Sequence, residues 1–220
     1  MKTVIIVAGG KGERMQTDIP KQFLEMRGKV VLMHTIEAFY RFDACVSIIT
    51  VLPSTQIDYW KELCKKHNFG IQHQIAEGGK TRFHSVQNGL KLASAHSLIA
   101  VHDGVRPLVS NETITRCFEN AAKFKAVVPV VDLTDSIRYT NENENCVADR
   151  TKYKLVQTPQ VFEGALLKKA YEQEFSPAFT DDASVVEALG KKIHLTEGNR
   201  ENIKITTAVD LKLAEMLVDF

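Results

Sequence analysis

The chain has 220 residues, 44% of them hydrophobic and 25% charged, so it can bury a full core without disulfides or a structural metal. Its 28 Lys and Arg residues nearly balance 27 Asp and Glu residues, which argues against broad binding to nucleic acid or membranes. No stretch is as long and apolar as a transmembrane helix, and the apolar run before Gly9 is too short for a secretion signal. We therefore expect a soluble, cytoplasmic protein that binds neither nucleic acid nor a membrane.

The first 131 residues alternate between apolar, β-branched runs and amphipathic segments. Mainly apolar runs predict buried strands at residues 4–8, 46–52, 98–102 and 126–131, and a further strand is expected at 71–76. Helical spacing predicts helices at residues 31–41, 54–67, 81–95 and 110–123. Ser54 and Ser110 are the expected N-caps of the second and fourth of these helices. Strands that alternate with helices predict an α/β fold with a mainly parallel sheet and helices on both faces.

Residues 132–153 differ from the rest, because they are polar and contain the run Asn-Glu-Asn-Glu-Asn. We interpret them as an extended β-arm that leaves the body of the protein. Such an arm buries little by itself, so we expect it to pack on a second copy in a homodimer. Beyond the arm, strands are expected at 155–157 and 192–196, and helices from Glu163, from Asp181 and at 207–217. Residues 1–220 are expected to form a single domain.

Cysteine and histidine show no pattern that is typical of a metal site. None of the four cysteines lies in a C-x-x-C pair, and the seven histidines lack the spacing of metal ligands. The cysteines are expected to be reduced core thiols, and the histidines to be ordinary exposed or hydrogen-bonded side chains. We therefore assign no metal ligand in the protein.

The first candidate site follows the first strand, where ligands bind in open parallel sheets. Residues 8–21 include Gly9, Gly10, Gly12, Arg14 and Lys21. Three glycines let backbone N–H groups approach a phosphate chain closely, and the two cations favour a triphosphate. The alternative is a surface turn with solvated charges. Met15 stands where the dinucleotide-binding motif requires its third glycine, so a dehydrogenase is disfavoured.

A second glycine pair follows the third strand. Gly79-Lys80-Thr81 resembles the end of a P-loop, but Gln74 stands where that motif requires its first glycine, so the P-loop is rejected. The backbone here and Ser85 are candidate contacts for a base or ribose. A turn followed by an N-cap explains Lys80 and Thr81 equally well.

A third candidate site combines the end of the fourth strand with a segment far along the chain. Asp103 and Arg106 lie three residues apart after that strand, and they suit either a polar ligand or an ion pair that shapes the loop. Lys204 lies between two isoleucines, so strand-like alternation turns it away from them and towards the cleft.

Together these segments resemble the 2-C-methyl-D-erythritol 4-phosphate cytidylyltransferase family. The matching segments span nearly the whole chain in family order: 8–15, 20–22, 102–107, 158–160, 180–184 and 202–206. The resemblance implies a Rossmann-like nucleotidyltransferase fold and a homodimer joined through the β-arm. It also implies CTP and a polyol phosphate as substrates, and Mg²⁺ held mainly by the CTP phosphates.

The same resemblance implies roles for individual residues. Arg14 and Lys21 would stabilise the transition state at the α-phosphate, and Arg150 and Lys204 would position the acceptor phosphate. The implied nucleotide contacts are Ala8, Gly9, Gly10, Gly12, Gly79 and Ser85. The implied acceptor contacts are Asp103, Arg106, Ser136, Thr158 and Thr180. Ser136 occupies the position of a family threonine, with Thr134 as the alternative. Lys80 and Thr81 occupy positions where some members carry acidic residues.

The expected activity is transfer of CMP from CTP to 2-C-methyl-D-erythritol 4-phosphate in non-mevalonate isoprenoid biosynthesis. Because the acceptor phosphate is already a nucleophile, the reaction needs aligned cations and no general base. The alternatives are a ribitol 5-phosphate cytidylyltransferase, another sugar-phosphate nucleotidyltransferase, and a nucleotide-binding module without catalysis. Ile203 before Lys204 favours methylerythritol phosphate, because the ribitol phosphate enzymes tend to carry an aromatic residue there.

Overall fold

The computed structural model describes residues 1–9 and 19–218 of the chain. Within them, eight strands form one sheet in the order β10-β7-β11-β6-β1-β4-β5, and β12 also pairs with β7. These strands are β1 (Lys2–Val7), β4 (Ser47–Leu52), β5 (Gln74–Glu77), β6 (Leu98–Asp103), β7 (Ala126–Asp132), β10 (Lys154–Val156), β11 (Gln160–Glu163) and β12 (His194–Glu197). The predicted α/β fold with a mainly parallel sheet is confirmed.

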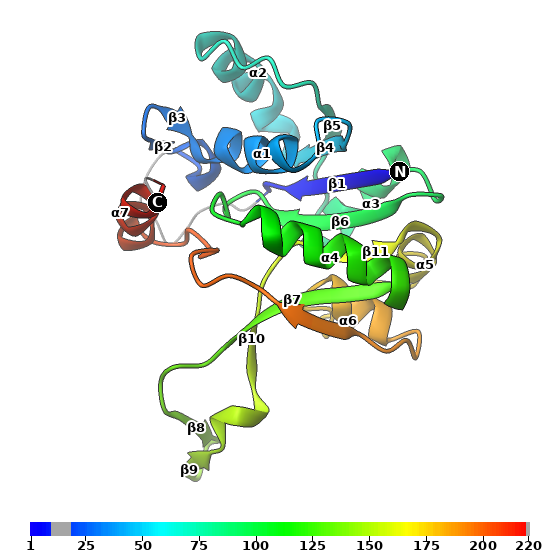
Figure 1. The fold of residues 1–220 in the computed structure, drawn as a ribbon, viewed down its shortest axis with the longest axis vertical. Coiled ribbons are helices and arrows are strands. Elements are labelled where there is room, and N and C mark those ends of the chain that lie inside the picture. The colour runs from blue at the N-terminus through cyan, green and yellow to red at the C-terminus, as the bar shows by residue number, and fades with distance from the viewer. Residues whose placement is uncertain (10–18, 219–220) are drawn as a thin grey trace.

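The helices cover both faces of this sheet (Figure 1). They are α1 (Val31–Phe42), α2 (Ile57–Lys66), α3 (Arg82–Leu92), α4 (Asn111–Phe124), α5 (Gly164–Ala170), α6 (Asp182–Glu187) and α7 (Ala208–Leu217). The side chains of β1 alternate between the two faces: Val4 and Ile6 pack in one core cluster with α1 and α4, and Ile5 packs in the other with α3, α5 and α6. A strand that is buried on both faces needs the continuous apolar run seen in its sequence.

Parallel pairing brings the carboxyl ends of the central strands to one edge of the sheet. Strand β1 pairs in parallel with both β4 and β6, and β4 pairs in parallel with β5. The segments that follow β1, β5 and β6 therefore meet at this edge, as the sequence predicted.

Two features of the sheet region were not predicted. Strand β11 lies between β6 and β7 and is antiparallel to both, with Val161 and Phe162 fully buried. A short hairpin, β2 (Glu25–Met26) and β3 (Lys29–Val30), precedes α1, and Gly28 takes a φ of 77° at its turn. A single short apolar run such as that of β11 does not reveal the direction of its strand.

The predicted Ser110 cap of α4 is confirmed, because its side chain accepts the Thr113 N–H. Asp181 and Thr207 also cap α6 and α7 through their side chains, and both form capping boxes. The predicted Ser54 cap is wrong: Ser54 begins a 3-10 turn, and α2 starts after Gln56 without a side-chain cap.

The prediction of core cysteines is also wrong for Cys45 and Cys146, which are exposed.

The arm is an antiparallel ribbon that extends away from the main sheet (Figure 1). It consists of β8 (Ile137–Thr140) and β9 (Asn145–Ala148), which form a separate two-stranded sheet. A 3-10 turn at Arg150–Lys152 then leads into β10. The arm exposes apolar side chains, with Tyr139 at 55% and Val147 at 78% of their full exposure.

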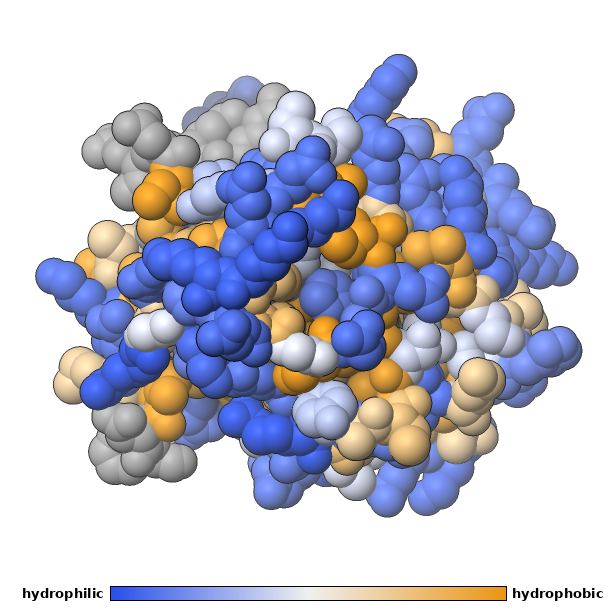
Figure 2. All heavy atoms as spheres, turned by 90° about the horizontal axis from the view of Figure 1, so that it is seen from above, coloured by the Kyte–Doolittle hydropathy of each residue, from blue (hydrophilic) through white to orange (hydrophobic). Residues whose placement is uncertain are grey.

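The surface seen from above is mainly hydrophilic, with hydrophobic side chains in small groups between polar ones (Figure 2). In the described part of the chain, no helix is both long enough and apolar enough to cross a membrane.

Replacing Gly164 tests the close approach between the start of α5 and the loop before β6. An added Cβ would lie 2.6 Å from the carbonyl oxygen of Ser97 and 2.8 Å from that of Ala95, and backbone atoms yield little. We expect Gly164→Ala to lower the free energy of unfolding by about 1–3 kcal/mol in a denaturant titration. Gly70→Ala is the matched control, because its Cβ would meet none of the described residues within 4 Å. Equal stability of the two variants would contradict this packing.

Candidate active site

A cavity of about 360 Å³ opens beyond the carboxyl ends of β1 and β6. Of the predicted nucleotide contacts, Ala8, Gly9, Gly79 and Ser85 line it. Of the predicted catalytic and acceptor residues, Lys21, Asp103 and Lys204 line it. The structure therefore brings together residues from four distant segments in a cleft at the sheet edge, which is where α/β proteins bind ligands.

The glycine pair before α3 forms a tight turn. The Gly79 N–H donates to Ser85 Oγ at 3.0 Å, and Ser85 Oγ donates to the Thr81 carbonyl at 2.9 Å. A Cβ at Gly79 would lie 2.4 Å from the Cβ of His84, so only glycine fits there. Thr81 caps α3 by accepting from the His84 N–H, which confirms the N-cap interpretation of this residue.

Gly9 is different, because the described residues leave space around it. Among them, a Cβ at Gly9 would meet Ser85 Oγ at an ordinary 3.9 Å. Because glycine has no side chain, the Gly9 backbone stays exposed to the cavity, where a ligand can approach it closely.

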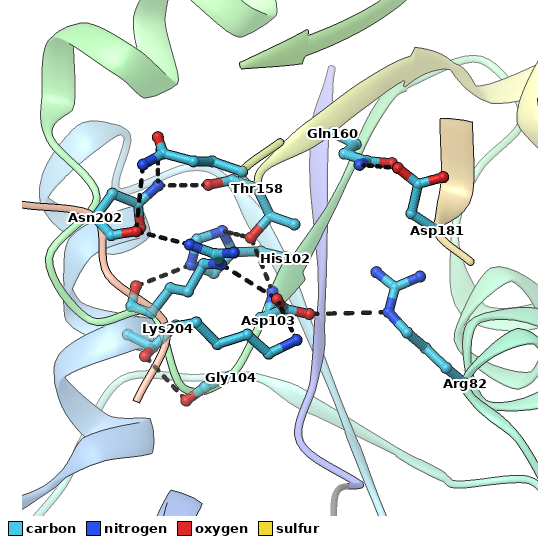
Figure 3. Close-up of polar contacts among 12 residues, drawn as sticks. Arg82, His102, Asp103, Gly104, Thr158, Gln160, Asp181, Asn202 and Lys204 are labelled. Atoms are coloured by element: carbon cyan, nitrogen blue, oxygen red, sulfur yellow. Dashed lines mark hydrogen bonds and ion pairs between the residues drawn. The ribbon is translucent and has the colours of Figure 1, made fainter. Parts of the chain in front are cut away.

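Asp103, the last residue of β6, is surrounded by cations (Figure 3). Its Oδ2 lies 3.0 Å from Lys204 Nζ and 3.2 Å from Arg106 Nε, and its Oδ1 lies 3.8 Å from Arg82 Nε. Burial by itself would raise the pKa of Asp103, but the charges of Arg82, Lys204 and Arg106 hold that pKa well below its usual range. The carboxylate is therefore ionised at any physiological pH.

Arg106 also fixes the segment that carries Lys204. Its Nη1 donates to the Asn202 carbonyl at 2.7 Å, and the Ile205 N–H donates to the Val105 carbonyl at 2.9 Å. Ile205 is buried while Lys204 lines the cavity, which confirms the predicted alternation. The expected Asp103–Arg106 ion pair is present as well.

Thr158 and His102 support Asp103 from inside the protein. Thr158 Oγ1 accepts the Asp103 N–H at 3.1 Å and lies 3.0 Å from His102 Nδ1. His102 Nε2 lies 3.0 Å from the Arg106 carbonyl oxygen, so a neutral ring satisfies both contacts: Nε2–H donates to the carbonyl, and Nδ1 accepts from the threonine. Burial lowers the pKa of His102 to about 4. His102 therefore supports the structure of the site, and the Thr158 hydroxyl is hydrogen-bonded to Asp103 and His102.

Arg82 is a cavity residue that the sequence analysis did not identify. Its Nη2 lies 2.6 Å from Oδ2 of Asp182, a residue of the 180–184 segment. The only sequence signal was a basic residue directly after Gly79-Lys80-Thr81, where any surface helix could begin with one.

Other predicted site residues lie away from the cavity or outside the described ranges. Arg150 is exposed on the 3-10 turn beside the arm, and its Nη1 donates to the Thr134 carbonyl. Ser136 and Thr180 are exposed, the first where the chain enters the arm and the second before α6. Gly10, Gly12 and Arg14 lie outside the residues that the structure describes.

The donors around the cavity fit a magnesium ion that is carried by a nucleotide. Among residues 1–9 and 19–218, no group of three or more His, Cys, Asp and Glu side chains could hold a metal. Asp103 supplies a carboxylate to the cavity lining. Mg²⁺ commonly keeps substrate phosphates and water as ligands, so a nucleotide can carry the ion into this cavity without a cage of protein ligands.

The buried His102 predicts a specific pH dependence of stability. His102 binds a proton near pH 6.5 in the unfolded chain but only near pH 4 in the folded chain. Its contribution to the free energy of unfolding is therefore fully present above pH 6.5 and is lost as pH drops towards 4. The loss is on the order of 3 kcal/mol from this residue. Denaturant titrations at several pH values should show a shallower dependence in His102→Asn than in the wild type, and parallel curves would contradict the assignment. Subtracting the two curves removes the smaller effect of His73, whose pKa burial also lowers.

Comparison with known proteins agrees with this geometry. A family model described as "2-C-methyl-D-erythritol 4-phosphate cytidylyltransferase" (IspD) matches residues 2–219. The protein of that name from Bacteroides thetaiotaomicron is 60% identical over 217 residues, which cover 99% of each chain. The crystal structure of the protein of that name from Thermus thermophilus has a TM-score of 0.80 at 33% identity and covers 100% of both chains. That of a 4-diphosphocytidyl-2C-methyl-D-erythritol synthase from Anaerococcus prevotii has a TM-score of 0.83 at 29% identity, covering 100% of this chain and 96% of its own. The chain belongs to the 2-C-methyl-D-erythritol 4-phosphate cytidylyltransferase family.

Proposed function

We propose that the protein transfers CMP from CTP to 2-C-methyl-D-erythritol 4-phosphate and releases pyrophosphate, a step of non-mevalonate isoprenoid biosynthesis. The observation that carries this proposal is that Lys21 and Lys204 line the same cavity as the glycine backbone at Gly9 and Gly79. The glycines let a phosphate chain approach closely, and the two lysines bring positive charge to it from both sides. The protein is expected to act in the cytoplasm.

The chemistry requires charge neutralisation and alignment. An oxygen of the acceptor phosphate attacks the α-phosphorus of CTP in line, the bond between that phosphorus and the β-bridging oxygen breaks, and pyrophosphate leaves. Two anions must meet, so the cations of the cavity lower the barrier, and no side chain needs to remove a proton. We assign Lys21, together with Arg14, to the transition state at the α-phosphate, and Lys204 to the acceptor phosphate.

Mg²⁺ is the expected metal, held mainly by the CTP phosphates. When bound, it supplies charge neutralisation at the triphosphate and orients the leaving pyrophosphate. Asp103 is the carboxylate among the described residues that line the cavity, but its oxygens are already paired with Lys204, Arg106 and Arg82, so no protein ligand is assigned to the ion.

A panel of acceptors tests the proposal. Pyrophosphate release is measured with CTP and either 2-C-methyl-D-erythritol 4-phosphate, ribitol 5-phosphate or a sugar 1-phosphate. We expect methylerythritol phosphate to give a kcat/KM at least about tenfold above the others, a difference of about 1.4 kcal/mol. Faster turnover of ribitol 5-phosphate would replace the proposed acceptor. CTP binding without pyrophosphate release from any acceptor would support a non-catalytic module.

The arm supports a homodimer of this single-domain chain. A two-stranded ribbon is marginally stable by itself, and this one exposes Tyr139 and Val147. Tyr153, at the end of the arm, and Leu155, just after it, are also about half exposed. A second copy that packs on these side chains removes them from water, as in an isologous interface.

We further propose that Arg150 acts in the cavity of the partner copy. It is exposed beside the arm and does not line the cavity of its own chain. A dimer formed through the arms can bring this guanidinium to the other site, where it would help to hold the acceptor phosphate.

Mixing two inactive variants tests this assignment. Lys21→Ala and Arg150→Ala should each lower turnover by about a hundredfold or more. If Arg150 acts across the dimer, a mixed dimer of the two variants has one intact site. Random subunit exchange should then restore about a quarter of wild-type turnover, because about half of the dimers are mixed. If Arg150 serves its own chain, both sites of the mixed dimer are defective, and the mixture stays inactive.

A further inference from the structure

A fully buried carboxylate lies behind the cavity. Asp182, the first residue of α6, has a side chain with no solvent exposure. Its Oδ2 lies 2.6 Å from Arg82 Nη2, and its Oδ1 accepts the Tyr171 hydroxyl at 2.6 Å. A buried carboxylate is costly unless it is paired and hydrogen-bonded, so Asp182 holds Arg82 in place as much as Arg82 stabilises Asp182.

The backbone that carries Arg82 is also fixed. Arg82 is the first residue of α3, directly after the cap formed by Thr81. The next residue, Phe83, packs in an aromatic cluster, with its ring centroid 4.7 Å from that of Tyr171 and 5.7 Å from that of Phe179. The guanidinium therefore extends from a rigid helix start. It pairs with Asp182 through Nη2 and reaches Asp103 through Nε, and Figure 3 shows the contact with Asp103.

The cations around Asp103 differ in how firmly they are held. Arg106 is 13% exposed and also donates to the Asn202 carbonyl, and Arg82 is 30% exposed and bound to Asp182. Lys204 is 41% exposed, and Asp103 is its one ion-pair partner in the described part of the chain. A lysine is a point charge on a long, rotatable stem, so Lys204 is the cation that can change partners.

We propose that Arg82, held by Asp182, is a positioning residue that keeps Asp103 compensated when Lys204 moves from Asp103 to the acceptor phosphate. This inference rests on the proposed function. Asp103 is buried, so losing Lys204 leaves it dependent on its remaining cations. With Arg82 in place, Asp103 keeps two cations, Arg82 and Arg106. Without Arg82, Asp103 binds Lys204 more tightly and competes with the phosphate for it.

A double-mutant cycle between Arg82 and Lys204 tests the inference. Arg82→Gln should lower kcat/KM for the acceptor by about tenfold or more and change the KM for CTP less than about twofold. In a Lys204→Ala background the same change should cost less than about twofold, because its effect passes through Lys204. Equal losses in both backgrounds would show that Arg82 acts independently of Lys204 and would overturn the inference.

A double variant that removes both charges separates the positioning role of Arg82 from its effect on folding. Arg82→Gln leaves Asp182 buried without its cation, so it is compared with Arg82→Gln/Asp182→Asn, in which both charges are removed. The double variant should recover the unfolding midpoint and remain as impaired with the acceptor as the single variant. Recovery of wild-type kcat/KM in the double variant would show that Arg82 serves only to neutralise Asp182, and would overturn the inference.

A remote substitution controls for lost stability. Thr3 is buried near the opposite end of β1, and its Oγ1 donates to Ser97 Oγ at 3.2 Å. Thr3→Val removes this buried hydrogen bond and should leave the acceptor KM unchanged. A raised acceptor KM in Thr3→Val would mean that destabilisation alone produces the Arg82 effect, against the inference.

A binding readout separates this inference from the proposed function. Wild-type turnover on the acceptor panel decides the function first. The cycle is then repeated with inorganic phosphate binding, measured by calorimetry. Arg82→Gln should weaken phosphate binding by about tenfold when Lys204 is present and by less than about twofold in the Lys204→Ala background. Additive losses in binding contradict the positioning role whatever the acceptor proves to be.

Discussion

The site depends on one buried carboxylate. Asp103 ends the central strand β6, and cations from separate parts of the described chain meet at its oxygens: Arg82 from α3, Arg106 from the following loop and Lys204 from a distant segment. A buried charge is tolerated only when it is compensated, so the ionised Asp103 requires these segments to converge. The same convergence concentrates positive charge at the cavity, where a reaction between two phosphates needs it.

The fold supports this arrangement through backbone as much as through side chains. Parallel pairing of β1 with β6 places Gly9 beside Asp103 at one sheet edge. The antiparallel strand β11 follows Thr158, whose hydroxyl accepts the Asp103 N–H beneath the cavity. A neutral, buried His102 completes this support, so the carboxylate rests on groups whose polar atoms are satisfied.

The molecule divides into a rigid sheet edge and a projecting arm. Many of the cavity residues, such as Ala8, Asp103 and Arg82, follow or end buried strands or begin α3, where packing restricts their backbone. Arg150 and the exposed apolar side chains belong to the arm and the turn beside it. This division fits the proposal that a partner copy completes the site, because Arg150 lies away from the cavity of its own chain.

The sequence by itself indicated most of the strands and helices and part of the cavity lining. Continuous apolar runs indicate buried strands, Ser110 and Thr207 mark helix starts through their own hydroxyls, and the polar run before Arg150 indicates the arm. These signals are local, because each depends on neighbouring residues. Only the tertiary structure decided that β11 runs antiparallel and that Arg82 joins Asp103 to Asp182. Strand direction and pairing between distant charges depend on how the whole chain is packed, and no short segment encodes them.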